Sequence, residues 1–325
     1  MSEVNVQTLN MSCGSVHFAS AADGQLPANG GLRVLSYDYD GQALEEARQL
    51  AERMTVKHRL YKTGFRGGKI VANVAYVCPD TLEEVTQTVA EELNRRHGDF
   101  YTGADLNYGE AQVQKLFEDT PYVLAAVGSG VHYAAATAAG AYGAVRTAKS
   151  FLDTSCAKIF VHGAGAVGSR VASDLAASGD HVFVYDKITA RGDLEGVVNL
   201  ADAQSWVNMP WDIVVLASGS HVMTAEIAEK LSAKAIVCVA NLPFRPTAKE
   251  ILEEKGTLIF DEGIASAGAV IADSIEFYNK TAWHEAPPED IYEFISNSVS
   301  EECFRKLAYF NLQFSPIGKH FLLGV

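Results

Sequence analysis

The sequence predicts an α/β protein of two domains, the second built around a parallel sheet. Three observations support this class. The chain has 325 residues, and at roughly 150 residues per domain this length favours two domains. Hydrophobic residues make up 48% of the chain, enough for a sizeable core. From Lys158 onward, short apolar runs alternate with helical segments, in the order KIFVH, HVFVYD, WDIVVLA, AIVCVAN and TLIFD.

The first half of the chain also mixes helices and strands. Apolar residues at helical spacing predict an amphipathic helix over residues 40–62, with Asp40 as its N-cap. The run IVANVAYV predicts a buried strand over residues 70–77. Thr81-x-x-Glu84 is typical of a capping box and predicts a helix that ends near Gly98. A helix of small residues is expected over about 134–150.

The domain boundary is expected near residue 145, ahead of the part of the sequence where short apolar runs alternate with helical segments. We predict a substrate-binding and catalytic α/β domain over residues 1–145 and a dinucleotide-binding domain over residues 146–299. The residues after Pro287 and Pro288 are predicted to be helical, and a C-terminal helix at about 300–325 is a candidate to pack back on the first domain.

Charge and composition exclude several classes of function. The chain carries 40 acidic and 26 basic residues, a net charge of −14, which argues against nucleic-acid and anionic membrane partners. The N-terminus lacks a signal-peptide pattern, and no apolar run reaches membrane-spanning length. The five cysteines are scattered and indicate reduced thiols in a cytoplasmic protein. The dispersed histidines and cysteines predict no metal site.

A glycine motif predicts a dinucleotide site. Gly163, Gly165 and Gly168 form GxGxxG between a strand and a helix, and Asp186 ends the next strand. Such glycines allow a tight turn, a close approach to a pyrophosphate and close helix–strand packing, which predicts a Rossmann-type domain. An acid at the position of Asp186 favours NAD over NADP, and Lys187 and Arg191 weaken that preference. The alternative is a structural glycine turn with no ligand.

Two lysines and an aspartate are candidates for the chemistry. Lys57 and Lys69 flank the segment HRLYKTGFRGG, and Asp105 lies in the turn-like run YTGADLN. A lysine at a buried strand is costly unless it is paired or functional. A buried lysine beside a carboxylate can transfer protons near neutral pH. The alternative is that all three are solvated surface residues.

The motifs around these residues resemble the glutamate/leucine/phenylalanine/valine-type amino-acid dehydrogenase family, most closely its leucine and phenylalanine dehydrogenases. The matching runs keep the family's order over about residues 26–280: GGLR (30–33), MTVK (54–57), GGK (67–69), TGADLN (102–107), AYG (141–143), GAGAVG (163–168), AN (240–241) and SAGA (266–269). The resemblance implies a small-molecule substrate in a cleft between the two domains, and reversible NAD-dependent oxidative deamination of an L-amino acid to a 2-oxo acid and ammonium.

The resemblance also implies residue roles. Lys57 matches the lysine that pairs with the substrate carboxylate, Lys69 the catalytic lysine that binds the keto oxygen and activates water, and Asp105 the acid that passes protons to and from the amino nitrogen. The cofactor-binding residues implied are Gly163, Gly165, Ala166, Val167, Gly168, Asp186, Lys187, Ala217, Ser218 and Asn241. Further substrate-binding positions are Asn29, Gly31, Gly103, Ser266, Val270 and Asp273.

Departures from the family pattern bear on activity and substrate. Gly140, Leu242 and Ser266 replace a threonine and two asparagines of the family. Asn29 and Asp273 stand where leucine-type enzymes have apolar pocket walls, which favours a substrate with a polar, even cationic, side chain. In the alternative, the side chain of Asp273 rotates out of the pocket, either to a salt bridge or to the surface of its helix.

Other functions and the assembly are also weighed. A shikimate- or methylenetetrahydrofolate-type dehydrogenase also places a lysine and an aspartate before a GxGxxG domain, and a non-enzymatic NAD-binding relative would share the fold. Ammonium dependence separates the first from an amino-acid dehydrogenase. The region ahead of GGLR looks short and without the strands that build the family's large oligomers, so we expect a homodimer.

Overall fold

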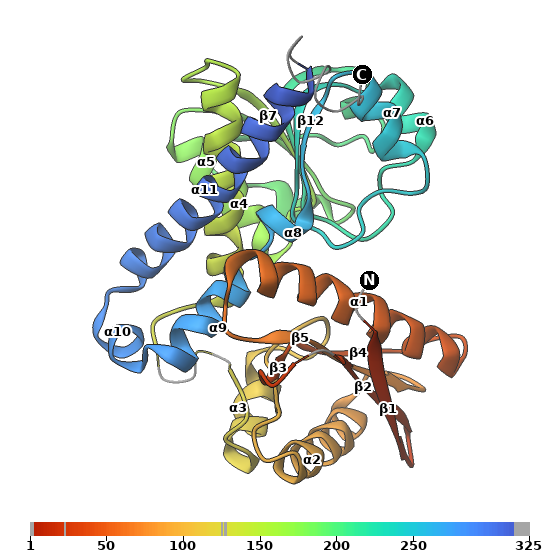
Figure 1. Ribbon diagram of the computed structural model, residues 1–325. Helices are drawn as coiled ribbons and strands as arrows, with labels where there is room; N and C mark the ends of the chain where they lie inside the picture. Colours follow the sequence, from red (N-terminus) through yellow and green to blue (C-terminus); the bar gives the residue numbers. More distant parts are fainter. Residues whose placement is uncertain (1–2, 23, 125, 127–128, 315–325) are drawn as a thin grey trace, which may run out of the picture. The chain divides into compact units, whose positions relative to one another are not determined.

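The computed structural model describes residues 3–22, 24–124, 126 and 129–314, and the side chains up to residue 308. The chain forms two compact units (Figure 1). Unit 1 comprises Met1–Gly130 and Val270–Ala286, and unit 2 comprises Val131–Ala269 and Pro287–Val325. This division differs from the predicted boundary near residue 145, because the helix before that boundary packs within unit 2 and a later segment returns to unit 1.

The sheet of unit 1 is mixed, with strand order β1–β2–β5–β3–β6 and β4 paired with β5. The strands are β1 (Val4–Met11), β2 (Gly14–Ala21), β3 (Ala28–Asn29), β4 (Leu32–Leu35), β5 (Arg66–Val74) and β6 (Phe100–Tyr101). β1 pairs antiparallel with β2, and β2 antiparallel with β5, whereas β3 and β4 lie parallel to β5. β5 begins and ends earlier than the predicted strand, and Lys69 lies inside it.

The N-terminal hairpin overturns one expectation. Strands β1 and β2 precede GGLR and pair along their full length. Along most of β1, half-buried and exposed residues alternate, which is the pattern of a half-buried strand and was available in the sequence. The predicted shortage of strands was therefore wrong, and with it the reason for expecting a homodimer.

The helices of unit 1 are α1 (Asp40–Tyr61), α2 (Pro79–Arg95), α3 (Glu110–Asp119), α9 (Gly268–Tyr278, from Val270 onward) and α10 (Lys280–Glu285). Two of them were predicted, α1 and α2, and their N-termini differ from the prediction, whereas α3, α9 and α10 were not predicted. Asp40 is not the N-cap of α1: its carboxylate instead accepts hydrogen bonds from Ser15 and His17. In α2 the capping box joins Cys78 and Thr81, so the helix begins before the predicted start.

Unit 2 holds a parallel sheet with strand order β12–β11–β10–β7–β8–β9. The strands are β7 (Lys158–His162), β8 (His181–Tyr185), β9 (Val197–Asn199), β10 (Pro210–Leu216), β11 (Ser232–Cys238) and β12 (Leu258–Phe260). The order reverses between β7 and β10, which is the doubly wound arrangement of Rossmann folds. This confirms the predicted α/β class and the predicted strands; β9 carries too few apolar residues to be seen in the sequence.

The helices of unit 2 are α4 (Tyr133–Phe151), α5 (Ala166–Ala177), α6 (Ala225–Lys230), α7 (Ala248–Glu254), α8 (Glu262–Ala265) and α11 (Pro288–Phe314), with short 3-10 turns at Thr189–Gly192 and Ser205–Asn208. α11 packs along α4, where Thr147 Oγ1 lies 2.7 Å from Ser300 Oγ. Its described side chains therefore belong to unit 2, contrary to the expectation that the C-terminal helix packs on the first domain. Residues 315–325 of that expectation lie outside the described residues.

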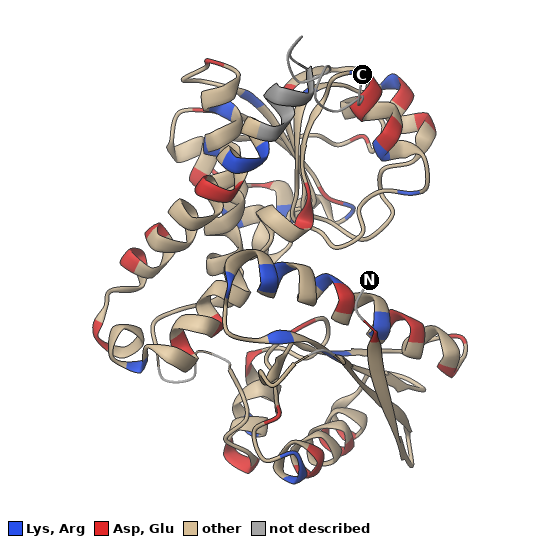
Figure 2. Ribbon diagram, in the orientation of Figure 1, with Lys and Arg blue, Asp and Glu red and all other residues tan. Residues whose placement is uncertain are grey.

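Charged residues gather on the helices and loops, and the strands of both sheets carry few of them (Figure 2). The interior of unit 2 is apolar and aromatic, with Phe160 stacked on Trp206 and Trp211. Among helices of the described residues, none is long and apolar enough to cross a bilayer.

Candidate active site

Unit 1 brings Lys69 and Asp105 into direct contact. The Lys69 ammonium donates a hydrogen bond to Oδ2 of Asp105. Lys69 is 5% exposed, and the Asp105 side chain is 24% exposed. Oδ1 of Asp105 accepts no hydrogen bond from the residues that the structure describes. The two candidates for proton transfer thus form an ion pair between a buried ammonium and a partly exposed carboxylate, with one carboxylate oxygen uncommitted.

A second cation completes this cluster. Arg33 of β4 donates from Nε to the same Oδ2 of Asp105 at 3.0 Å, and from Nη1 to Glu46 of α1. The other oxygen of Glu46 accepts a hydrogen bond from the Tyr37 hydroxyl at 2.6 Å. A single guanidinium therefore connects the carboxylates of Asp105 and Glu46, as its planar fork of donors allows.

Burial and the neighbouring charges together lower the pKa values of both members of the pair. Burial lowers the pKa of the Lys69 ammonium; Asp105 raises it in part and Arg33 lowers it further. Burial raises the pKa of the Asp105 carboxyl, but the Lys69 and Arg33 cations outweigh burial and hold the pKa well below its usual range. The proton of the pair therefore resides on Lys69.

Close backbone packing places Asp105. A Cβ on Gly31 would lie 2.8 Å from the Ala104 carbonyl oxygen and 3.0 Å from Asp105 Cβ, so the residue before Leu32 must be glycine to let the Asp105 loop approach. The loop is closed by mutual backbone hydrogen bonds between Asp105 and Tyr108. Tyr108 is buried and lies 2.7 Å from Thr86 Oγ1. Gly31 therefore acts by admitting the Asp105 loop.

Helix α1 contributes Lys57, which is 5% exposed. Lys57 and Glu46 are separated by close to three helical turns, so both lie on one face of α1. The next residue, His58, is buried and lies between Thr63 Oγ1 at 2.7 Å and the Asn29 carbonyl oxygen at 3.1 Å. Burial lowers the pKa of His58 to about 4, so it is neutral at pH 7.

The predicted side-chain pocket residues Asn29 and Asp273 are both buried. Asn29 is 1% exposed, and its Oδ1 has no hydrogen-bond partner among the described residues. Asn29 is the register partner of Tyr101, whose ring packs against Phe277 with centroids 4.9 Å apart. Asp273 lies one turn before Phe277 on α9 and is 9% exposed, so it is not a solvated surface residue.

The other pocket positions are divided between the units. Val270 is buried in the part of α9 that belongs to unit 1. A Cβ on Gly103 would lie 2.4 Å from the Leu124 carbonyl oxygen, so this position is small because two backbones meet there. Ser266 is 9% exposed and follows α8 in unit 2. The structure thus brings Asn29, Val270 and Asp273 into one unit and assigns Ser266 to the other.

In unit 2 the glycine motif joins β7 to the N-terminus of α5, and the residues predicted with it lie at the same sheet edge. Gly163 has φ +101°, which requires glycine, and a Cβ on Gly168 would lie 2.0 Å from the Gly163 carbonyl oxygen. Ala166 and Val167 begin α5. Ala217 and Ser218 follow β10 directly, and Asn241 lies beyond β11.

Gly165 has a different environment. Its φ of −72° suits any residue, and no protein atom lies within 4 Å of where its Cβ would be. Neither backbone conformation nor packing of the chain explains a glycine here. An open space above the first amides of a helix is what a bound pyrophosphate requires, so the residues present fit a dinucleotide.

Asp186 directly follows β8 and holds this loop through hydrogen bonds to two backbone amides. Its Oδ2 accepts a hydrogen bond from Ala164 N, and its Oδ1 accepts one from Ile188 N, both at 2.8 Å. Burial raises the pKa of Asp186, but these amides and the cations of Arg191 and Lys187 lower it overall, so the carboxylate stays charged. Each oxygen keeps a lone pair with which to accept a ribose hydroxyl.

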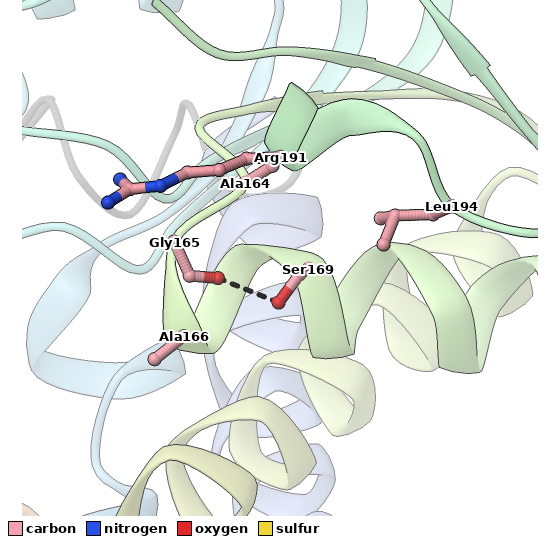
Figure 3. Close-up of a pocket in the computed structure, with 6 residues that line it drawn as sticks. All are labelled: Ala164, Gly165, Ala166, Ser169, Arg191 and Leu194. Carbon is pink, nitrogen blue, oxygen red and sulfur yellow. Dashed lines mark hydrogen bonds between the residues drawn. The ribbon is translucent and has the colours of Figure 1, made fainter. Parts of the chain in front are cut away.

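A cavity of about 390 Å³ opens over the loop (Figure 3). It is lined by Ala164, Gly165, Ala166, Ser169, Arg191 and Leu194. Ser169 donates back to the Gly165 carbonyl oxygen at 2.8 Å, and the Arg191 side chain extends over the loop in Figure 3. The pocket therefore combines helix amides, a cation and an apolar wall, as an adenosine phosphate requires.

Sequence reasoning missed several site residues. Glu46 and Tyr37 were not singled out, and Arg33 entered only as part of a motif. The signal available was the charge of Arg33 within the otherwise apolar run LRVL, because a charge in a half-buried strand is costly unless it is paired. His162, which lies 2.6 Å from Ser218 Oγ and joins the ends of β7 and β10, carried no recognisable spacing.

Comparison with known sequences identifies proteins that are similar over most of the chain. The sequence profile described as glutamate/leucine/phenylalanine/valine dehydrogenase matches residues 184–311. Phenylalanine dehydrogenase of Caldalkalibacillus thermarum is 26% identical over 268 residues, which cover 78% of this chain and 72% of that protein. Leucine dehydrogenase of Geobacillus stearothermophilus is 26% identical over 267 residues, which cover 78% of this chain and 72% of that protein.

Solved structures share the fold. L-tryptophan dehydrogenase from Nostoc punctiforme aligns with a TM-score of 0.71 and 23% identity, covering 95% of this chain and 89% of that chain. Hetero-hexameric glutamate dehydrogenase from Thermus thermophilus aligns with a TM-score of 0.78 and 20% identity, covering 95% of this chain and 84% of that chain.

Proposed function

Because the chain belongs to the glutamate/leucine/phenylalanine/valine dehydrogenase family, we propose that it catalyses the NAD-dependent, reversible oxidative deamination of an L-amino acid to a 2-oxo acid and ammonium. Enzymes of this family are amino-acid dehydrogenases, oxidoreductases that act on CH–NH2 groups. The chain spans about 70% of the length of the curated relatives that it matches.

The observation that carries the proposal is the ion pair between buried Lys69 and partly exposed Asp105. Burying an ammonium costs free energy that a structural role seldom needs. A lysine whose pKa burial lowers is suited to exchange protons near neutral pH. With Asp105 holding one oxygen uncommitted, the pair offers both a base and an acceptor for a substrate nitrogen.

Each residue has a role in this reaction. Lys57 is a buried cation suited to the substrate carboxylate. Lys69 binds the keto oxygen and, as the free amine, removes a proton from the attacking water. Asp105 carries protons to and from the amino nitrogen through its uncommitted oxygen. These roles leave the α-carbon free to lose its hydride.

The cofactor assigned to unit 2 is NAD, which when bound supplies the hydride acceptor. The residues that would hold it are the glycine loop, the first amides of α5, and Asp186. A carboxylate at the end of β8 accepts hydrogen bonds from a ribose 2′-hydroxyl and repels a 2′-phosphate. Arg191 and Lys187 reduce that repulsion, so some use of NADP is expected.

The substrate side chain is proposed to be polar. Asn29 brings an unpartnered buried oxygen, and Asp273 a buried carboxylate, to the region beside Tyr101 and Phe277. A buried amide oxygen without a partner costs free energy that a substrate donor would recover. Substrates with a hydroxyl, amide or cationic group on the side chain are therefore preferred candidates.

The test is a screen of L-amino acids by NAD⁺ reduction, with NADP⁺ in parallel and with 2-oxo acids and ammonium in the reverse direction. Lys69→Ala and Asp105→Asn should each lower kcat by about 10²–10⁴, while NADH still binds, because the lysine and the aspartate lie in unit 1 and the glycine loop in unit 2. Near wild-type kcat in Lys69→Ala would show that this lysine is not catalytic. Turnover that does not require ammonium would favour a ketone reductase instead.

The assembly is a separate question. A homodimer was expected from a shortage of N-terminal strands, and β1 and β2 remove that reason. Sedimentation velocity of the full chain would measure the number of subunits directly.

A further inference from the structure

We propose that Arg33 is a positioning residue for the Lys69–Asp105 pair and that Glu46 controls how strongly Arg33 acts on it. The inference rests on the proposed dehydrogenase activity and extends it to residues that touch no substrate. It assigns a function to the chain of contacts that runs from Asp105 through Arg33 and Glu46 to Tyr37.

The geometry fixes the orientation of Asp105. Arg33 Nε and Lys69 Nζ both donate to Oδ2, so two donors from two strands hold one oxygen. Rotation of the carboxylate would break both contacts. Oδ1 is thereby kept as the oxygen available to a substrate nitrogen. The Arg33 side chain is 12% exposed, so water replaces little of this contact.

The Arg33 guanidinium also contacts a second carboxylate, that of Glu46. Its Nη1 donates to Glu46, so the guanidinium serves two carboxylates at once. Glu46 is held in place by the Tyr37 hydroxyl at 2.6 Å. Burial and the contact with Glu46 raise the pKa of Tyr37, so its hydroxyl stays protonated and donates a hydrogen bond to Glu46. Glu46 therefore competes with Asp105 for the hydrogen bonds of Arg33.

The printed contacts of the pair lead to Arg33 of β4, then to Glu46 of α1, and then to Tyr37 in the segment between β4 and α1. The formal charges of Lys69, Arg33, Asp105 and Glu46 sum to zero. Arg33 lowers the pKa of both Asp105 and Lys69, and Glu46 raises that of Lys69. Removing either Arg33 or Glu46 unbalances the cluster, with opposite signs.

The two substitutions should shift the pH profile of the reaction in opposite directions. In amino-acid oxidation, Asp105 and Lys69 both act in their deprotonated forms. Arg33→Gln removes a neighbouring cation, raises the pKa of both groups, and moves the acidic limb of the kcat/KM profile to higher pH. Glu46→Gln removes an anion and moves that limb to lower pH. The signs are the same for both groups, so the test does not depend on which of them governs the limb.

The experiment measures kcat/KM against pH for the best L-amino acid found in the screen, using the full-length wild type and both variants. An opposite charge within a few ångströms shifts a buried carboxyl by about one to three pH units, so Arg33→Gln should move the limb up by about one unit or more. Arg95→Gln and Glu83→Gln change the net charge of unit 1 by the same amounts at an exposed face of α2 and should not move it.

The conservative variant Arg33→Lys separates charge from geometry. It keeps a cation, so the acidic limb should stay near that of the wild type. An ammonium cannot bridge two carboxylates with the rigid fork of a guanidinium, so kcat should fall. A merely structural role for Arg33 would lower kcat in Arg33→Gln and Arg33→Lys and leave the limb of both where it was.

A second measurement does not need turnover. In protein labelled with ¹³C at the aspartate carboxyl carbons, the Asp105 resonance is the one that disappears in Asp105→Asn. Its titration midpoint should rise in Arg33→Gln and not in Arg95→Gln. If no amino acid is oxidised with either cofactor, the proposed function fails, and this titration still decides whether Arg33 sets the charge of Asp105.

Two results would overturn the inference. One is an acidic limb that is the same in Arg33→Gln, Glu46→Gln and the wild type. The other is a limb that moves in the same direction in both variants, because a shared loss of packing would do that and a balance of charges would not.

Discussion

Replacing Gly165 with alanine should weaken NADH binding and leave folding almost unchanged. The backbone at Gly165 has a φ of −72°, and no protein atom lies within 4 Å of the added Cβ. The methyl group therefore meets only what binds above the helix. Gly168→Ala is the matched contrast, because its Cβ would lie 2.0 Å from the Gly163 carbonyl oxygen.

The expected magnitudes follow from these environments. At a compatible backbone, replacing glycine with alanine raises the free energy of unfolding by about 0.4–1 kcal/mol, because the unfolded chain loses conformational entropy. Losing the N-cap glycine lowers the free energy of unfolding by a similar amount. The free energy of unfolding of Gly165→Ala should thus stay within about 1 kcal/mol of the wild type. Gly168→Ala forces two backbones apart and should cost about 1–3 kcal/mol or more. For NADH, a pyrophosphate held away from one helix amide loses a charged hydrogen bond of about 1.5–3 kcal/mol.

The assay is a fluorescence titration with NADH together with thermal unfolding in the absence of cofactor. Gly165→Ala should raise the dissociation constant at least about tenfold, equivalent to about 1.4 kcal/mol, with a Tm close to that of the wild type. Gly168→Ala should lower Tm by several degrees. NADH affinity within twofold of the wild type in Gly165→Ala would refute the reasoning, as would a loss of Tm equal to that of Gly168→Ala.

Three further predictions concern cofactor choice, substrate choice and acid stability. Asp186→Ser should raise the KM for NAD⁺ and allow measurable turnover with NADP⁺; a wild type that already prefers NADP⁺ in steady-state kinetics contradicts this. Asp273→Val combined with Asn29→Leu should move activity toward leucine or phenylalanine in the amino-acid screen, and the idea fails at once if the wild type prefers an aliphatic or aromatic substrate. Because burial lowers the pKa of His58 from 6.5 to about 4, the unfolded chain binds more protons between these values, and the free energy of unfolding should fall as the pH drops through this range. Denaturant titrations of His58→Gln should show a flatter dependence, and an unchanged slope would mean that His58 is not the group responsible.

The sequence alone determined the class of the fold and the cofactor loop. The strands of the parallel sheet are continuous apolar runs because both faces are buried, so they are visible without a structure. Gly163 and Gly168 mark positions where a side chain does not fit, and the turn between β7 and α5 requires glycine at both. The order of motifs along the chain likewise indicated the family, which the comparisons with relatives support.

Register and long-range packing were decided only by the tertiary structure. Leu32 pairs with Ile70 and Arg33 with Val71 in the parallel ladder, and this register places the side chain of Arg33 on the same sheet face as that of Lys69. A shift of the β4–β5 register by one residue would place the Arg33 side chain on the opposite face of the sheet and separate it from Lys69 and Asp105. No local sequence pattern specifies this register. The same holds for the return of Val270 and Asp273 to unit 1 and for the packing of α11 on α4. These contacts join residues far apart in sequence, and their free energy comes from complementary surfaces that form only when the chain has folded.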